Sequence, residues 1–170
     1  GGGSVSGNGV ADLALIAYEF GKHAAPGPLV DCNVVASALS GMGGEFQQAA
    51  LGEILTGAAI AANCLGAAPW QRASEATARI DRNGDELVIS GAVRPVESGM
   101  QAGYLLVTGQ SDGGPSQVLI RADAAGVTLK ALKGMDVTRR FVSASFDNVR
   151  VPANALVGAF GGAAAQVRRQ

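Results

Sequence analysis

The residues that could carry chemistry in this 170-residue chain are few and widely separated. His23 is the only histidine, and no acidic or cysteine residue stands at ligand spacing from it, so a catalytic base is the lesser interpretation. It lies just past a helix stop signal, where a cation is favourable. Cys32 and Cys64 form no CxxC pair and join no histidine cluster, which argues against a disulfide framework or a zinc site and favours two free thiols.

Two glycine-rich segments, residues 1–9 and 41–44, invite comparison with nucleotide-binding loops. A dinucleotide loop needs a strand before it and a helix after it, whereas helices are expected on both sides of residues 41–44 and no strand before residue 1. No Gly-Lys-Ser/Thr sequence follows, which excludes a P-loop. We therefore interpret these glycines as linkers or helix caps. The scattered glutamates are interpreted as solvated carboxylates.

The composition is that of a soluble globular protein with no bias toward a charged partner. The chain is 48% hydrophobic and 16% charged, with a formal net charge of -1. No nucleic-acid partner is expected, because this balance gives nucleic acid no strong electrostatic footprint. The first residues lack the basic-then-apolar order of a signal peptide, and the longest apolar run, residues 58–69, is too short to span a bilayer. We expect a cytoplasmic protein with no membrane span.

Helical periodicity dominates the first third of the chain. Apolar residues repeat at helical spacing over residues 10–17, before the stop signals Gly21 and Pro26. Further helices are expected over residues 29–40 and 45–56. In the second of these three helices, Val30, Val34 and Ala38 lie on one side. None of the three has a long hydrophobic face, so they are expected to pack on another part of the protein.

The hydrophobic period changes to that of β-strands after about residue 74. Residues 77–82 and 85–90 flank Asn83-Gly84, whose tolerance of a positive φ suits a tight hairpin turn. Four more strands are expected, over residues 104–108, 117–122, 126–132 and 141–151.

The last of these strands has the clearest alternation. Val142, Ala144 and Phe146 share one face, and Pro152 ends the strand because proline has no amide donor for the ladder. Several strands at this spacing predict a compact barrel or sandwich. The residues alone therefore predict an α+β protein in two parts that divide near residues 68–74, unfinished at both ends.

Two further features are interpreted structurally. Trp70, at the junction of the helical and β parts, is expected to act as a hydrophobic plug between them. The basic pair Arg139-Arg140 follows Asp136 and Thr138, and we expect it to form local ion pairs before the last strand. Phosphate binding by the pair is the minor alternative.

In order along the chain, these segments resemble the acyl-CoA dehydrogenase family. The amino-terminal loop and helix are similar in residues 1–3, 10–13 and 19–22, and the turn that follows is similar in residues 25–29. Residues 83–91 (NGDELVISG) are similar to the family's hairpin that leads into its flavin-facing loop.

The match continues through the β region. Residues 102–107 (AGYLLV), 126–127 and 136–139 (DVTR) follow in the expected order. The strongest match is residues 145–152 (SFDNVRVP), closing on residues 156–158 (LVG). No single segment is diagnostic, whereas the ordered set is.

The resemblance implies a three-part subunit. Residues 1–68 would form part of a helical amino-terminal domain, residues 69–158 an antiparallel β-barrel or sandwich middle domain, and residues 159–170 the start of a carboxy-terminal helical bundle otherwise absent from the chain. It also implies FAD as cofactor and the α,β-desaturation of an acyl-CoA thioester, in which a glutamate base removes the α-proton and flavin accepts the β-hydride. The base and a flavin-binding arginine are expected beyond Gln170, so no catalytic residue is assigned in this chain, which alone is expected to be inactive.

The chain departs from the family where the flavin would lie. The family's Thr-Glu-Pro strand falls near residues 63–66, which keep none of those three residues. Its Trp-Ile-Thr/Ser loop falls near residues 95–98, where Pro95 replaces the aromatic residue and Ser98 alone keeps a hydroxyl. By position, flavin contacts, mostly through backbone groups, are expected at Cys64, Leu65, Val96, Glu97 and Ser98.

This weakened flavin face is similar to that of divergent actinobacterial subunits that work in heteromeric pairs on steroid side-chain or other bulky CoA esters. The first hypothesis is a FAD-dependent acyl-CoA dehydrogenase subunit of lipid β-oxidation, acting on a fatty or steroid side-chain thioester. The second is a non-catalytic partner subunit with a degraded flavin site, and the third is an unrelated β-barrel binding module. The expected partners are an acyl-CoA substrate, another dehydrogenase subunit in a homo- or hetero-oligomer, and an electron-transfer flavoprotein-like acceptor.

Overall fold

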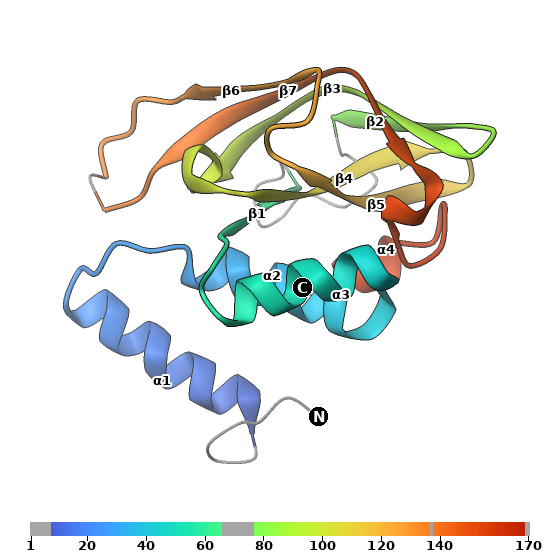
Figure 1. Cartoon of the computed structure of the whole chain (residues 1–170). Helices are drawn as coiled ribbons and strands as arrows, with labels where there is room; N and C mark the ends of the chain where they lie inside the picture. Colours follow the sequence, from blue (N-terminus) through green and yellow to red (C-terminus); the bar gives the residue numbers. More distant parts are fainter. Residues whose placement is uncertain (1–7, 66–76, 137, 169–170) are drawn as a thin grey trace.

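Helices cover one side of a curved β-sheet (Figure 1). The computed structural model describes residues 8–65, 77–136 and 138–168. Its helices are α1 (Gly9–Lys22), α2 (Leu29–Met42), α3 (Glu45–Leu55) and the short α4 (Ala164–Val167). The three helices expected in the first third of the chain are confirmed. Trp70, interpreted as a plug between the two parts, lies outside the described residues.

The sheet has eight strands in the described part of the chain. They are β1 (Ala61–Cys64), β2 (Ala78–Asn83), β3 (Glu86–Glu97), β4 (Tyr104–Ser111), β5 (Gly114–Arg121), β6 (Val127–Ala131), β7 (Phe141–Pro152) and β8 (Leu156–Val157). The strand order is β6-β7-β3-β2-β4-β5-β8, and β1 pairs with β4. The predicted α+β class is confirmed. The sheet is mostly antiparallel, but β1 and β2 each pair with β4 in parallel.

Two strands and the end of a third were not predicted from the sequence. Strand β1 lies before residue 74, and its four residues are too few and too uniformly buried to show alternation. Strand β8 has only two residues. Strand β3 continues through Pro95 and Val96, which were expected in a loop; the ladder shifts register between Val93 and Val96, so an amide donor is dispensable there.

Two hydrophobic cores share the strands β4 and β5. The inner core lies within the curved sheet and includes Leu105 and Val107 of β4, whereas Leu106 on the opposite face belongs to the core beneath α2 and α3. This alternation places successive β4 side chains on opposite faces, as a pleated strand requires. The predicted inward face of β7 is confirmed, because Val142, Ala144 and Phe146 are all buried in the inner core.

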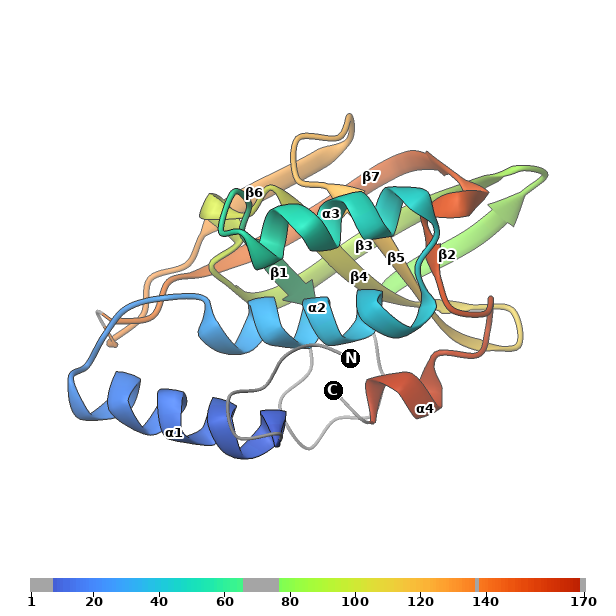
Figure 2. The same ribbon diagram turned by 60° about the horizontal axis from the view of Figure 1, so that its bottom comes forward.

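Helices α2 and α3 cross the sheet side by side (Figure 2). The buried side of α2 is formed by Val35, Ala38 and Leu39, whereas Val30 is 60% exposed. Helix α1 lies apart from this layer and buries none of its residues. No helix in the described part of the chain is long and apolar enough to cross a membrane.

Candidate functional site

A groove runs between the start of α2 and the end of β3. It has a volume of about 480 Å³ and merges with a hollow of about 310 Å³, with which it shares Gly27, Pro28, Glu97 and Thr138. We call the larger cavity the α2–β3 groove. Its lining comprises Ala17, Phe20, Gly21, Ala24, Ala25, Gly27, Pro28, Leu29, Val30, Asp31, Glu97, Thr138 and Arg139. One wall is therefore largely apolar, and the opposite end holds the charged and hydroxyl-bearing side chains.

An ion pair between Glu97 and Arg139 defines the polar end of the α2–β3 groove. Arg139 donates from Nε to Oε1 at 3.1 Å and from Nη2 to Oε2 at 2.5 Å, and its guanidinium lies 4.8 Å from the centre of the Phe141 ring. Hydrogen bonding to Glu97 raises the pKa of Arg139. The ion-pair partner of Arg139 is therefore the distant Glu97, whereas Asp136 accepts hydrogen bonds from the amide and hydroxyl of Thr138 and acts on the Arg139 guanidinium through its charge.

Asp31 is the second carboxylate of the α2–β3 groove. It lies in the first turn of α2, and the Asn63 amide donates to its Oδ2 over a long distance of 3.5 Å. Burial raises the pKa of Asp31 to about 6; the Asn63 amide opposes this shift, the Glu97 carboxylate adds to it, and Arg139 opposes it. Asp31 is a perturbed acid in a cleft, the kind of group that often marks a functional site.

The structure brings two of the five predicted flavin contacts to this cavity and places the others elsewhere. Glu97 lines the α2–β3 groove, and both Glu97 and Ser98 line the adjoining hollow. Cys64 and Val96 are fully buried in the inner core, and burial raises the pKa of the Cys64 thiol. Leu65, just after β1, is half-buried. Only Glu97 and Ser98 can therefore present side chains to a ligand in the cavity.

Ser98 forms the tight turn that follows β3. Its φ is 55°, in the left-handed region, and its residue is only 9% exposed. Its amide donates to the Arg140 carbonyl at 2.7 Å, and its carbonyl accepts from the Gln101 amide at 3.1 Å. Since both backbone groups are engaged, the hydroxyl is the group of Ser98 best placed to contact a ligand.

Asp31 was not among the predicted site residues, and the prediction for His23 is confirmed in part. Asp31 looked like an ordinary acidic residue near a helix start, and only the tertiary fold buries it. His23 caps the end of α1, with Nδ1 2.9 Å from the Glu19 carbonyl oxygen, so its expected place after a helix is confirmed. The expectation of no acidic neighbour is wrong, because the Glu19 carboxylate lies 3.6 Å from the same nitrogen. The two free thiols are confirmed.

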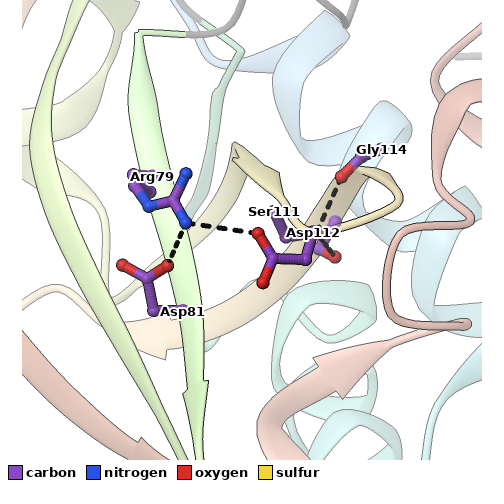
Figure 3. Close-up of polar contacts among 6 residues, drawn as sticks. Arg79, Asp81, Ser111, Asp112 and Gly114 are labelled. Carbon is purple, nitrogen blue, oxygen red and sulfur yellow. Dashed lines mark hydrogen bonds and ion pairs between the residues drawn. The ribbon is translucent and has the colours of Figure 1, made fainter.

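In the described part of the chain, the other clusters of charged side chains consist of ion pairs between their own members. Figure 3 shows Arg79 between two carboxylates, with Nη2 2.7 Å from Asp81 and 3.3 Å from Asp112. These side chains are exposed, and exposed ion pairs add little stability. No group of three or more potential metal ligands occurs among the described residues. The α2–β3 groove is therefore the candidate site.

Comparisons with known proteins agree with this fold. No family model and no curated protein sequence matches the chain. Among solved structures, the chain matches a glutaryl-CoA dehydrogenase from Mycobacterium smegmatis in complex with FADH2 at 25% identity and a TM-score of 0.67, over 76% of this chain and 35% of that one. It matches the Tcur3481-Tcur3483 steroid acyl-CoA dehydrogenase at 25% identity and a TM-score of 0.73, over 82% and 38%.

The match with the widest coverage among these comparisons is a heteromeric assembly. The ChsE4-ChsE5 complex from Mycobacterium tuberculosis aligns with a TM-score of 0.81 at 20% identity, over 94% of this chain and 43% of that one. The chain thus spans well under half the length of the proteins it matches. It has the fold of the acyl-CoA dehydrogenases, as its sequence resemblance implied.

Proposed function

We propose that the chain is part of a FAD-dependent acyl-CoA dehydrogenase subunit that desaturates an acyl-CoA thioester between its α and β carbons. The observation that carries this proposal is the position of Glu97 and Ser98. By sequence they correspond to the loop beside the flavin in the family, and both line a cavity instead of packing into the core. That placement fits a cofactor at this edge of the sheet.

Within this proposal, Glu97 and Ser98 hold FAD through side chains. Cys64, Leu65 and Val96 contribute backbone groups only, since the side chains of Cys64 and Val96 fill the inner core and Leu65 does not line the cavity. When bound, FAD supplies the hydride acceptor. The Ser98 hydroxyl acts as a hydrogen-bond partner of the cofactor, and the apolar wall of the α2–β3 groove excludes water from the acyl chain. The catalytic base belongs to a part of the subunit outside this chain.

The role of Ser98 can be tested by flavin affinity. In the complete gene product, we expect Ser98→Ala to weaken FAD binding about tenfold, the loss of one hydrogen bond to a bound group. Ser40→Ala is the matched control, since its hydroxyl bonds only the nearby Ser37 carbonyl on the exposed side of α2. Unchanged affinity in Ser98→Ala would remove this residue from the site.

The substrate proposed is a fatty or steroid side-chain acyl-CoA. The apolar wall formed by Phe20, Leu29 and Val30 suits a hydrocarbon group. The proposed partners are a second dehydrogenase subunit, in a homo- or hetero-oligomer, and an electron-transfer flavoprotein-like acceptor. We also propose the division into a helical segment (residues 1–68), a β middle domain (69–158) and the start of a helical bundle (159–170), in a cytoplasmic protein.

A second candidate function is a non-catalytic partner subunit of a heteromeric acyl-CoA dehydrogenase. It is favoured by Pro95 in place of an aromatic residue and by the buried side chains of Cys64 and Val96. The visible absorbance spectrum separates the two. Flavin bands in the complete protein expressed alone support the dehydrogenase, flavin bands only after co-expression with a neighbouring subunit support a shared site, and no flavin in either case contradicts the enzyme.

A further inference from the structure

The α2–β3 groove carries an excess of negative charge at its polar end. Arg139 neutralises Glu97 through a two-bond fork. Among the described residues, the remaining carboxylate, Asp31, receives one hydrogen bond, the long contact from the backbone amide of Asn63. The groups that act on Asp31 are the Asn63 amide from β1, the Glu97 carboxylate from β3 and the Arg139 guanidinium. Two carboxylates and one guanidinium leave a formal charge of about -1 above the pKa of Asp31.

We propose that Asp31 is a specificity-determining residue that makes the α2–β3 groove reject acyl groups ending in a carboxylate and accept neutral ones. This inference rests on the proposed function, because it takes the groove as the place of the acyl group. It goes beyond that function by stating which acyl groups the groove accepts as substrates.

Two physical effects act together against an anionic acyl end. An incoming carboxylate meets the like charge of Asp31 in a cleft where solvent screening is reduced. It also finds the fork of Arg139 occupied, since Nε and Nη2 already donate to Glu97. Displacing Glu97 would leave that carboxylate, whose side chain is only 19% exposed, without its partner. A neutral chain end meets neither cost.

The fold itself does not impose this selectivity. A neighbour of the same fold is described as a glutaryl-CoA dehydrogenase, and glutaryl is an acyl group with a terminal carboxylate. The discrimination therefore has to come from local side chains, and Asp31 is the carboxylate of the groove that lacks a strong cationic partner.

The test compares the affinities of the complete protein for two CoA ligands whose acyl groups have five carbons. They are the non-reactive thioether analogues of pentanoyl-CoA and glutaryl-CoA, and only the second carries a terminal carboxylate. Dissociation constants are measured by calorimetry at about pH 7.5 and about pH 5.5, on either side of the pKa of Asp31. We expect the wild type to bind the pentanoyl analogue about tenfold more tightly at the higher pH. We expect Asp31→Asn to abolish most of that preference, and the wild-type preference to fall at the lower pH.

Asp123→Asn is the matched control, because it removes the same charge from an exposed carboxylate paired with Arg121 outside the α2–β3 groove. It should leave the preference unchanged. A preference that persists in Asp31→Asn while the pentanoyl analogue still binds would overturn this inference and leave the proposed function standing. Failure of both analogues to bind the wild-type protein would overturn the proposed function as well.

Discussion

Glu97 and Arg139 are joined by two hydrogen bonds, of 3.1 and 2.5 Å, although they lie 42 residues apart in the sequence. The pair ties the end of β3 to the segment that precedes β7 and closes the polar end of the α2–β3 groove. The Glu97 side chain is only 19% exposed, so the pair is screened by solvent on one side alone.

We predict a measurable coupling free energy between these two side chains. A double-mutant cycle of Glu97→Gln and Arg139→Ala, followed by urea unfolding of the complete protein, should give about 1 kcal/mol, the upper end for partly exposed pairs. The comparison is Glu86 with Arg150, a single 3.2 Å contact in which both side chains are more than half exposed. Its coupling should be close to zero, and equal values for the two pairs would contradict the geometry described here.

The raised pKa of Asp31 predicts that part of the stability is lost on going toward neutral pH. The folded protein holds the Asp31 proton up to its raised pKa of about 6, whereas the unfolded chain releases it near the ordinary aspartate pKa of 3.8. Between these values the folded state binds more protons, so the free energy of unfolding falls as pH rises, by at most about 3 kcal/mol.

Asp31→Asn should therefore remove this slope and leave the protein more stable than the wild type at neutral pH. Urea unfolding as a function of pH measures it, with Asp123→Asn, at a largely exposed carboxylate, as the control that keeps the wild-type profile. A variant that is less stable than the wild type at neutral pH would show that charged Asp31 is well solvated.

Gln47 should be sensitive to substitution. Its side chain is fully buried, donates to the carbonyls of Asn154 and Leu156 at 2.6 and 3.0 Å, and accepts from the Gly44 amide at 3.0 Å. Gln47→Ala leaves these groups unpaired and opens a cavity, at a cost of roughly 2–4 kcal/mol in unfolding free energy.

The neighbouring Gln48→Ala is the matched control. Gln48 is exposed and makes one hydrogen bond, to the Leu39 carbonyl, so its loss should cost less than about 1 kcal/mol. Equal destabilisation by the two variants would mean that the hydrogen bonds from Gln47 to Asn154 and Leu156 add no more stability than the single contact of Gln48.

Gly91 should resist replacement by alanine. Its φ is +102°, an added Cβ would lie 2.8 Å from the Thr77 carbonyl oxygen, and the β3–β7 ladder shifts register at this residue. Gly91→Ala should cost roughly 1–3 kcal/mol. Gly52→Ala in α3 meets open space and should instead stabilise by about 0.5–1 kcal/mol, so thermal denaturation should move in opposite directions for the two variants.

Local signals in the sequence predicted most of the elements. The Asn83-Gly84 turn is confirmed, with Gly84 at a φ of +62° and Asn83 paired with Glu86. Asn83 ends β2, and Gly84 is the residue that takes the positive φ, which glycine adopts without steric cost, so the hairpin is specified by its own residues. The inward face of β7 could also be predicted from the sequence, because apolar and polar residues alternate along a half-buried strand.

Interactions between distant segments escaped the sequence. The two-residue β8 exists because it pairs with Gln117 and Val118 of β5, and nothing in its own residues indicates a strand. Arg139 was assigned a local partner, whereas the fold gives it Glu97. Asp31 becomes unusual only when α2 packs on the sheet and removes its carboxylate from solvent. Neither a partner across the fold nor the burial of an isolated acid is encoded in a local pattern.

The most direct test of the central proposal is an anaerobic titration of the complete protein, purified with its flavin and any co-expressed subunit, with a saturated acyl-CoA. The proposed dehydrogenase predicts that the visible flavin absorbance bleaches as the thioester is desaturated. A protein that carries flavin and keeps its full absorbance with fatty and steroid side-chain thioesters alike, or one that never carries flavin, would contradict it.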